Sequence, residues 1–591
     1  MSSVSPLPRL AGALAAFGAL YLASPGILTA DGLWPLAVLA LAVWASVASR
    51  SGRKALLVEW AAGSIGWALI CSWAAYVWWG TLFWMGPGMG LYMAGAGWVL
   101  RRLARRLPLG LAAPLAWVGV EALRAIVPAP CGNEWMRLGT HLHGEPWIAG
   151  SACVWGFLGL SFAIAALGGL FADLWNARGR ASLASLVAGL GPVALAIALA
   201  LAVPAPQTRD GPRVLLVQPS FAQARKMESR HAADLFAEAL ELTRLGVQEA
   251  ERAGEPAPDL VAWGETMLPV PLPQPGLAEA LARGARPPAW WNSDLDAKDI
   301  AWLEGVRRRW VGQELLGLPP SQGAGVLPPG AVFVSGVEHL LARDGIVRRQ
   351  NAVVVWDVRG EASPAAAKRK LVPGAETMLG LERFSPVRST IYALAGYVPD
   401  LLAGERTGVL PFATRESERY AFGASVCYDN AFDGPYTEPL REGPLDFHLV
   451  VSNEAWFRSS HEMDQMVAFS HLIAIQTGRS VVRATNAGIT VVIAPDGSEV
   501  ARLRVAGRDR EVAGTLRASV PVPAPGGPGT GGARTITPFV RFERVWKLLW
   551  LALPAAALAW TLRPAAGNRR ERRGRSPRAA DSPPPGRPSG P

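Results

Sequence analysis

The apolar residues of this chain are gathered in two blocks that flank a segment of mixed polarity. Residues 213–517 show the mixed polar and apolar pattern of a globular protein. Several of the apolar stretches reach the roughly 18 residues that read as a membrane helix. The pattern predicts a membrane domain of seven helices over residues 1–205, a globular domain over residues 212–520, and an eighth membrane helix. The eight apolar stretches are residues 10–30, 33–47, 56–79, 82–100, 109–127, 147–174, 182–203 and 546–562.

Basic residues between these stretches predict how the chain is oriented. With eight spans, the clusters at residues 50–54, 101–106 and 178–180 and the tail after residue 563 fall on the same side as the N-terminus. Because cytoplasmic loops are enriched in Lys and Arg, both termini are predicted in the cytoplasm. The globular domain is then extracytoplasmic, on the periplasmic face of a bacterial inner membrane.

The net charge of +11 arises partly from a Ser/Pro/Gly-rich basic tail over residues 563–591, which is predicted to be disordered. Beside a membrane helix, such a tail favours contact with anionic lipid headgroups over nucleic acid.

The globular segment alternates strand-like and helix-like runs. This alternation predicts an α/β sandwich in which helices cover sheets. Residues 271–329 interrupt it with a Pro- and Arg-rich insertion that contains four tryptophans, which lie either near the bilayer or in packing positions within the insertion. Predicted strands cover residues 214–218, 259–263, 331–337, 351–357, 420–427, 447–452, 480–484 and 489–494, and predicted helices cover residues 234–251 and 461–478.

Cysteine and histidine usage narrows the chemistry. The four cysteines form no CxxC pattern, and the seven histidines show no ligand spacing, so we expect no disulfide framework, no metal and no cofactor. Cys427 is the only cysteine of the globular segment, and it closes an apolar run that is followed by turn residues. Taken alone, Cys427 is better interpreted as a small apolar core residue, as most free cysteines are.

Two further stretches favour a catalytic interpretation. Glu265 follows a predicted strand, and Lys368 or its neighbour Lys370 follows the run that leads away from residues 351–357. A thiol can attack a carbonyl, a carboxylate can remove the thiol proton, and an ammonium can stabilise the oxyanion. These groups suffice for acyl transfer through a thioester, and no GxSxG elbow, phosphate loop or dinucleotide fingerprint competes with them.

Five stretches, in order, resemble the motifs of one family. Residues 259–269 (DLVAWGETMLP), 368–376 (KRKLVPGAE) and 425–429 (SVCYD) resemble the glutamate, lysine and nucleophile motifs of the bacterial apolipoprotein N-acyltransferases, a branch of the nitrilase or carbon-nitrogen hydrolase superfamily. Residues 451–457 (VSNEAWF) and 483–490 (RATNAGIT) resemble two further signature stretches. The seven-plus-one arrangement of membrane spans is also that of the family.

The resemblance implies a nitrilase-like αββα sandwich and a two-step reaction. Family members take an acyl chain from a phospholipid onto the cysteine and pass it to the N-terminal amine of the diacylglyceryl-cysteine of an apolipoprotein. Carried over to this chain, Cys427 is the nucleophile, Glu265 the general base and Lys368 the oxyanion stabiliser. Lys368 is preferred to Lys370 because its spacing to Glu376 matches the family pattern. The implied supporting residues are Glu376, Tyr428, Asp429, Asn453 and Trp456.

The chain departs from the family pattern at several positions, and these leave alternatives open. Gly264 replaces a proline, Asp429 a glutamate and Arg458 a glycine, while Gly374 and Ala375 replace an aromatic-Gly pair. The alternatives are a membrane-anchored amidase or nitrilase-type hydrolase, a divergent N-acyltransferase with another amine acceptor, and a scaffold without activity. Residues 271–329 and 380–401 are candidate lids that would keep water from the thioester.

Overall fold

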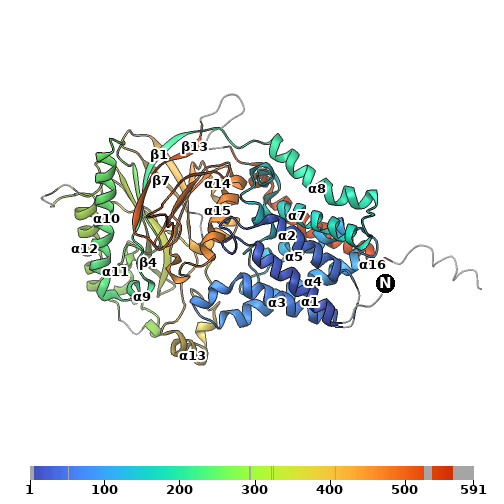
Figure 1. Ribbon diagram of the computed structural model, residues 1–591. Coiled ribbons are helices and arrows are strands. Elements are labelled where there is room, and N and C mark those ends of the chain that lie inside the picture. Colours follow the sequence, from blue (N-terminus) through green and yellow to red (C-terminus); the bar gives the residue numbers. More distant parts are fainter. Residues whose placement is uncertain are drawn as a thin grey trace, which may run out of the picture.

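The computed structural model describes residues 6–563, apart from residues 51, 53, 292–293, 321–322, 324, 406–407 and 525–534. The tail that was predicted to be disordered lies outside the described residues from residue 564 onward. The described chain has two halves, a bundle of helices and a sandwich of β-sheets with helices on its outer faces (Figure 1).

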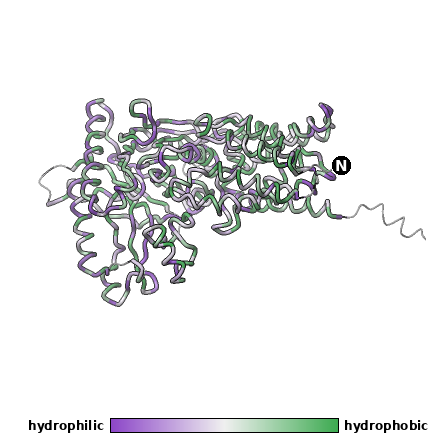
Figure 2. Tube along the Cα trace, turned by 60° about the horizontal axis from the view of Figure 1, so that its bottom comes forward, coloured by the Kyte–Doolittle hydropathy of each residue, from purple (hydrophilic) through white to green (hydrophobic). Residues whose placement is uncertain are grey.

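The bundle contains one long helix in each of the eight apolar stretches. Among the described residues, α5, α7, α8 and α16 are long and apolar enough to cross a membrane, by length and composition. Apolar residues predominate along this half of the molecule (Figure 2). The long helices are α1 (Pro6–Ala23), α2 (Trp34–Ala48), α3 (Ala55–Ile70), α4 (Thr81–Leu103), α5 (Leu109–Ile126), α7 (Ala152–Asn176), α8 (Leu183–Ala202) and α16 (Pro538–Leu562).

Arginines gather at the end of the bundle that lies away from the sheets, where the N-terminus is found (Figure 1). Arg9 and Arg101 both donate to backbone carbonyls at the end of α2, at 3.2 Å each. Arg106 donates to the carbonyl of Trp560, near the end of α16, at 2.9 Å. The basic clusters of separate loops thus share one end of the bundle.

Two helices differ in length from the apolar stretches that predicted them. The third helix ends at Ile70 and continues as the short helix η1 (Ser72–Tyr76), where Trp73 donates to Gln465 of the sandwich at 3.2 Å. The last helix, α16, begins at Pro538 rather than at residue 546. Its first turns carry Glu543, which is 2 % exposed and pairs with Arg441 and Lys547. These first turns contain charged residues, so the apolar pattern does not show that they belong to the helix.

The half of the described chain that forms the sandwich is built on two sheets. The first has the strand order β13-β1-β2-β4-β5-β6, with β3 beside β4, and the second has the order β12-β11-β10-β9-β8-β7. Within them, β1, β2 and β4 run parallel, as do β8, β9 and β10. The strands of the first sheet are β1 (Thr208–Gln218), β2 (Leu260–Trp263), β3 (Leu272–Pro273), β4 (Val332–Arg343), β5 (Ile346–Trp356), β6 (Ala366–Ala367) and β13 (Gly514–Pro523). Those of the second are β7 (Val409–Ala413), β8 (Arg419–Val426), β9 (Phe447–Ser452), β10 (Ser480–Thr485), β11 (Val491–Ile493) and β12 (Glu499–Arg502).

Alternating side chains of these strands build two kinds of core. Leu216 and Ala262 of the first sheet pack against Phe422 and Val451 of the second, so the sheets face each other. The opposite face of the first sheet is covered by α10 (Ala232–Arg252). The opposite face of the second is covered by α14 (Gly434–Glu442) and α15 (Glu462–Thr477). The predicted αββα sandwich is therefore confirmed.

Helix α15 joins the two halves. Every residue of α15 is buried, because one side packs on the second sheet and the other on the helical bundle. Gly478, at φ +65°, ends α15 in the left-handed conformation that favours glycine. Arg137, between α5 and α7, reaches Asp433 at the start of α14 through two hydrogen bonds of 2.9 and 3.0 Å. The sandwich therefore packs directly against the helical bundle.

The insertion over residues 271–329 packs on the outer face of the first sheet. Its helices α11 (Leu277–Ala282) and α12 (Ala297–Arg307) lie with α10, on the side of the sandwich away from the bundle (Figure 1). Trp310 stacks on Phe236 of α10, with ring centroids 4.5 Å apart. The apolar side chains of this segment, together with Trp291 and Trp310, contribute to the core of the sandwich, as the packing interpretation expects, whereas Trp302 is exposed.

Candidate active site

Three of the predicted catalytic residues follow strands that end at one edge of the sandwich. Glu265 lies two residues after β2, Lys368 follows β6, and Cys427 follows β8. Because parallel strands place their carboxyl ends at the same edge of a sheet, and the two sheets face each other, these loops converge. The side chains are buried: Glu265 is 7 %, Lys368 1 % and Cys427 8 % exposed.

Lys368 is held between two carboxylates. Its Nζ lies 2.8 Å from Oε1 of Glu376 and 3.8 Å from Oε1 of Glu265. The second oxygen of Glu376 accepts a hydrogen bond from the backbone N–H of Val372 at 2.8 Å, which closes the turn between the two residues. Burial opposes the charge of Lys368, but Glu376, Cys427 and Glu265 together raise its pKa, so the ammonium keeps its proton.

Glu265 is oriented by an amide that the sequence did not single out. Nδ2 of Asn351, in β5, donates to Oε1 of Glu265 at 2.5 Å. Burial raises the pKa of Glu265, and the Lys368 charge opposes that rise. A carboxylate with a raised pKa is a stronger base, as proton abstraction from a thiol requires. Asn351 is the first residue of the buried run that ends β5, and the residues after it are apolar, so only its polarity at that position could have identified it.

Cys427 begins the short helix η7 (Cys427–Ala431) in a strained conformation. Its φ of +46° lies in the left-handed region, which costs a non-glycine residue about 1–3 kcal/mol. Burial raises the pKa of its thiol well above the usual value, the Glu265 carboxylate adds to this, and Lys368 opposes it. The thiol is therefore protonated and requires a base before it can attack.

Asp429 holds the turn that carries Cys427. Its carboxylate accepts hydrogen bonds from the backbone N–H groups of Val426 at 3.1 Å and Lys370 at 2.7 Å, and also from that of Arg369. Burial raises the pKa of Asp429 to about 6, against the effect of Lys368 and these N–H groups. The shorter aspartate thus ties the nucleophile turn to the lysine loop.

The other predicted supporting residues lie farther from the three central side chains. Asn453 accepts from Asn486 at 2.9 Å and donates to Gln223 at 2.8 Å, so it joins the ends of β9 and β10 to the loop after β1. The ring of Tyr428 stacks with that of Trp135 from the bundle, at 6.1 Å between centroids.

Trp456 is half-buried in the turn η8 (Glu454–Trp456) that follows β9. The next residue, Phe457, meets Trp73 edge-on at 5.0 Å between ring centroids. The turn after β9 therefore contacts the bundle through Phe457 and Trp73, which lies in η1.

Two departures from the family pattern have a structural reason in this chain. A Cβ at position 264 would come within 3.0 Å of the carbonyl oxygen of Ser452 and of the backbone nitrogen of Asn486, so glycine allows a close approach there. Arg458 has a φ of +52°, which explains why glycine suits that position, and its guanidinium lies over the ring of Tyr76 at 5.4 Å.

A second residue that the sequence did not single out is Lys226, in the short helix α9 (Gln223–Lys226) after β1. Its Nζ donates to the backbone carbonyl of Glu265 at 2.9 Å and to Oγ1 of Thr266 at 3.1 Å.

In the described part of the chain, no group of three or more His, Cys, Asp or Glu side chains is arranged to hold a metal ion.

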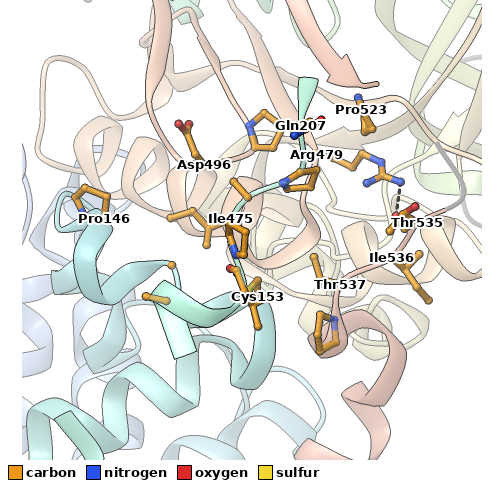
Figure 3. A pocket seen from close by; sticks show the side chains of 18 of the residues that line it. Pro146, Cys153, Gln207, Ile475, Arg479, Asp496, Pro523, Thr535, Ile536 and Thr537 are labelled. Carbon is orange, nitrogen blue, oxygen red and sulfur yellow. Dashed lines mark hydrogen bonds between the residues drawn. The ribbon is translucent and has the colours of Figure 1, made fainter. Parts of the chain in front are cut away.

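A cavity of about 320 Å³ lies elsewhere, where α7 and α8 meet the sandwich (Figure 3). Cys153, Ile475 and several prolines line it. Arg479, at its edge, donates to the carbonyls of Leu445 at 2.6 Å and Thr535 at 2.7 Å. The arginine thus joins chain segments, and the cavity contains none of the three converging side chains.

The fold and this site define a carbon-nitrogen hydrolase-type catalytic domain on a helical membrane bundle. Residues 331–519 match the family model described as carbon-nitrogen hydrolase. Residues 14–170 match that of the apolipoprotein N-acyltransferase N-terminal domain. Together with the relatives below, these matches show that the chain is similar to the apolipoprotein N-acyltransferases, which are acyltransferases, over most of its length.

Curated relatives cover most of the chain. The apolipoprotein N-acyltransferase of Pseudomonas aeruginosa (strain LESB58) is 26 % identical over 551 residues, which are 90 % of this chain and 91 % of the relative. That of Bordetella bronchiseptica is 28 % identical over 601 residues, with 93 % and 97 % covered. Among solved structures, a glutamate mutant of the amidase from Nesterenkonia sp. AN1 matches 52 % of this chain and 93 % of its own, at 14 % identity and a TM-score of 0.32.

Proposed function

We propose that this protein is a membrane-bound N-acyltransferase that moves an acyl chain from a phospholipid, through a thioester on Cys427, to the N-terminal amine of an apolipoprotein. The observation that carries the proposal is the buried cation of Lys368, 2.8 Å from Glu376 and 3.8 Å from Glu265, at the strand-end edge that also holds Cys427. The matches to relatives named for this activity support it.

In the first half-reaction, Glu265 removes the thiol proton of Cys427, and the thiolate attacks an ester carbonyl of the phospholipid. The ammonium of Lys368 stabilises the oxyanion of the tetrahedral intermediate. When the intermediate collapses, the carbon–oxygen bond breaks, and Glu265 returns the proton to the alkoxide. The products are an acyl thioester and a lysophospholipid.

In the second half-reaction, the lipoprotein amine attacks the thioester carbonyl. Glu265 takes a proton from the attacking nitrogen, and Lys368 again stabilises the oxyanion. The carbon–sulfur bond breaks, and the proton held by Glu265 passes to the sulfur of Cys427. The product is an amide on the N-terminal cysteine, and the enzyme is restored.

We propose that the catalytic half faces the periplasm of a bacterium, with both termini in the cytoplasm. The arginines at the end of the bundle away from the sandwich support this orientation, because cytoplasmic loops are enriched in basic residues. Exposed apolar side chains on α8 and α16, such as Leu183 and Leu548, fit contact with lipid tails.

Transfer to an amine requires that water is kept from the thioester, and α13 (Ser385–Ala395) is suited to this role. It follows the loop that carries Glu376, and Figure 1 places it at the margin of the sandwich near the level where the bundle begins. Phe384 is 60 % and Leu394 65 % exposed. Nearby, Asp400 accepts hydrogen bonds from Trp290 at 2.7 Å and Trp291 at 2.6 Å, which anchor the end of the segment over residues 380–401.

The double variant Phe384→Ser/Leu394→Ser is expected to hydrolyse more thioester per transfer than the parent protein, because a polar lid admits water. The ratio of free fatty acid to acylated lipopeptide measures this. Val358→Ser, which changes an exposed apolar residue in the turn after β5, is the control and should leave the ratio unchanged. An unchanged ratio in the double variant would contradict the lid.

The proposed function is tested by peptide mass spectrometry of the full chain in detergent with phospholipid. We expect an acyl mass on the peptide that contains Cys427, and we expect a diacylglyceryl lipopeptide to remove it and become acylated. An adduct that only water removes would indicate a hydrolase. An adduct that only another amine removes would indicate a different acceptor. The absence of an adduct with several phospholipids would refute the thioester route from a phospholipid donor.

A further inference from the structure

Lys226 reaches into the site from a segment that none of the matching motifs contains. Its Nζ contacts three successive residues of the glutamate loop: the carbonyl of Glu265 at 2.9 Å, Oγ1 of Thr266 at 3.1 Å and Sδ of Met267 at 3.5 Å. One ammonium with three donors thus spans the whole turn after β2.

The turn that Lys226 spans is strained. Thr266 has a φ of +49°, in the left-handed region that a β-branched residue rarely adopts. Such a conformation persists only when surrounding contacts hold it. On the other side, Gly336 of β4 packs so closely that a Cβ there would lie 2.6 Å from the Cα of Glu265. The turn after β2 is therefore held by Lys226 through hydrogen bonds and by the close packing of Gly336 in β4.

The helix that carries Lys226 is itself fixed. Phe221 donates its backbone N–H to Oδ1 of Asn486 at 2.8 Å, and Nδ2 of Asn486 returns a bond of 2.8 Å to the Phe221 carbonyl. Gln223 accepts from Asn453 at 2.8 Å, and Arg225 pairs with Glu238 of α10. The lysine thus projects from a short helix that is bound to the ends of β9 and β10.

We infer that Lys226 is a positioning residue for the general base: it holds the strained turn that aims the Glu265 carboxylate at Cys427, and it places an ammonium group beside that turn. This inference rests on the proposed function only in the role given to Glu265. Lys226 acts through Glu265 and is separate from Lys368, which contacts the carboxylate itself.

The charge of Lys226 affects the pKa of Glu265 together with several other charged groups. Burial raises the pKa of Glu265, and both Lys368 and Lys226 lower it. Burial lowers the pKa of Lys226 to about 8, and Glu265 opposes that shift. Removal of the Lys226 charge therefore raises the pKa of Glu265, so the base becomes ionised only at a higher pH. The charged or titratable groups that interact with Glu265 are Lys226, Lys368, Glu376, Cys427 and Glu462.

The test is the pH dependence of Cys427 alkylation by iodoacetamide, followed by peptide mass spectrometry of the full chain in detergent. This readout needs neither acyl donor nor acceptor, so it can fail independently of the proposed function. We expect Lys226→Met to shift the acidic limb of the alkylation rate to higher pH and to lower the plateau of that rate. Lys226→Arg keeps the charge and changes the contacts, so it should keep the limb and lower the plateau.

Three comparisons make the outcome decisive. Glu265→Gln should lose the limb at lower pH and keep only the rise at the higher pH where the Cys427 thiol itself ionises, which identifies the lower limb with this carboxyl group. Lys298→Met, at an exposed position of α12, should match the parent protein. Lys226→Gln replaces Lys226→Met if the latter does not fold, as judged by thermal unfolding. A lowered plateau with an unmoved limb in the uncharged variant would reduce Lys226 to a structural contact and overturn the inference.

Discussion

Cys427→Ala is expected to carry no acyl chain and to transfer none, with a loss of transfer rate of at least ~10³-fold. The reason is that the proposed reaction forms its only covalent bond to the enzyme at this sulfur. The buried cluster of Lys368, Glu265 and Glu376 does not depend on a bond to the thiol, so the variant should fold. Peptide mass spectrometry and a lipopeptide acylation assay measure the effect.

The matched control is Cys131→Ala. Cys131 is an exposed free cysteine in the loop after α5, so its loss should leave the acyl adduct and the transfer rate unchanged. Persistent transfer by Cys427→Ala, with the protein folded, would show that the acyl chain reaches the amine without this thioester.

Lys368→Met is expected to reduce both activity and stability. Loss of the oxyanion partner should slow thioester formation by about 10²–10³-fold. Removal of one member of a buried ion pair typically costs about 3–5 kcal/mol in the free energy of unfolding. Lys368 is 1 % exposed and leaves Glu265 and Glu376 without their shared cation. Thermal unfolding and single-turnover acylation measure the two effects.

The difference in stability between Lys368→Met and the parent protein should depend on pH, because it involves a buried ammonium and the carboxyl groups beside it. The folded pKa of Lys368 is raised, so its stabilisation is fully present below the unfolded lysine value of about 10.4. In Lys368→Met, Glu265 loses the cation that opposes the effect of burial on its pKa, so this buried carboxyl group is tolerated better when it is protonated. The deficit in Tm relative to the parent protein should therefore be larger at pH 8 than at pH 5. An equal deficit at both values would contradict the shared-cation arrangement.

Lys370→Met is the control that separates the two candidate lysines. Lys370 lies with its Nζ 5.1 Å from the ring centroid of Phe432, and it contacts Asp429 only through its backbone N–H. Its loss should change stability by about 1 kcal/mol or less and change the acylation rate only slightly. If Lys370→Met instead abolished acylation and Lys368→Met did not, the assignment of the amine would have to be reversed.

Local sequence patterns sufficed for the strands that precede Glu265 and Cys427, whereas the two-residue strand β6 that precedes Lys368 was not predicted. Short apolar runs bounded by turn residues predicted β2 and β8, and these strands end where expected. Gly478 marked the end of α15, because only the left-handed conformation is required there. The convergence of the three side chains also followed, since parallel strands end at one edge.

Other features depend on residues far apart in the chain. The first turns of α16 carry charges that hide a helix from a hydropathy pattern, and only their pairing with Arg441 of α14 explains the burial of Glu543. The tryptophans near residue 300 suggested a membrane surface, whereas the stacking of Trp310 on Phe236 assigns that one to the core of the sandwich.

The sequence by itself determined the order of the long helices of the bundle and of eight strands, the resemblance to the family and the three candidate catalytic residues, because each depends on periodicity or on a short motif. It did not predict the strands β3, β6, β7, β12 and β13. Only the tertiary structure decided which groups tune those side chains. Asn351 and Lys226 stand 86 and 39 positions from Glu265 in the chain and reach it from β5 and α9. Hydrogen bonds across such separations are set by the packing of whole strands and helices, and no local pattern records them.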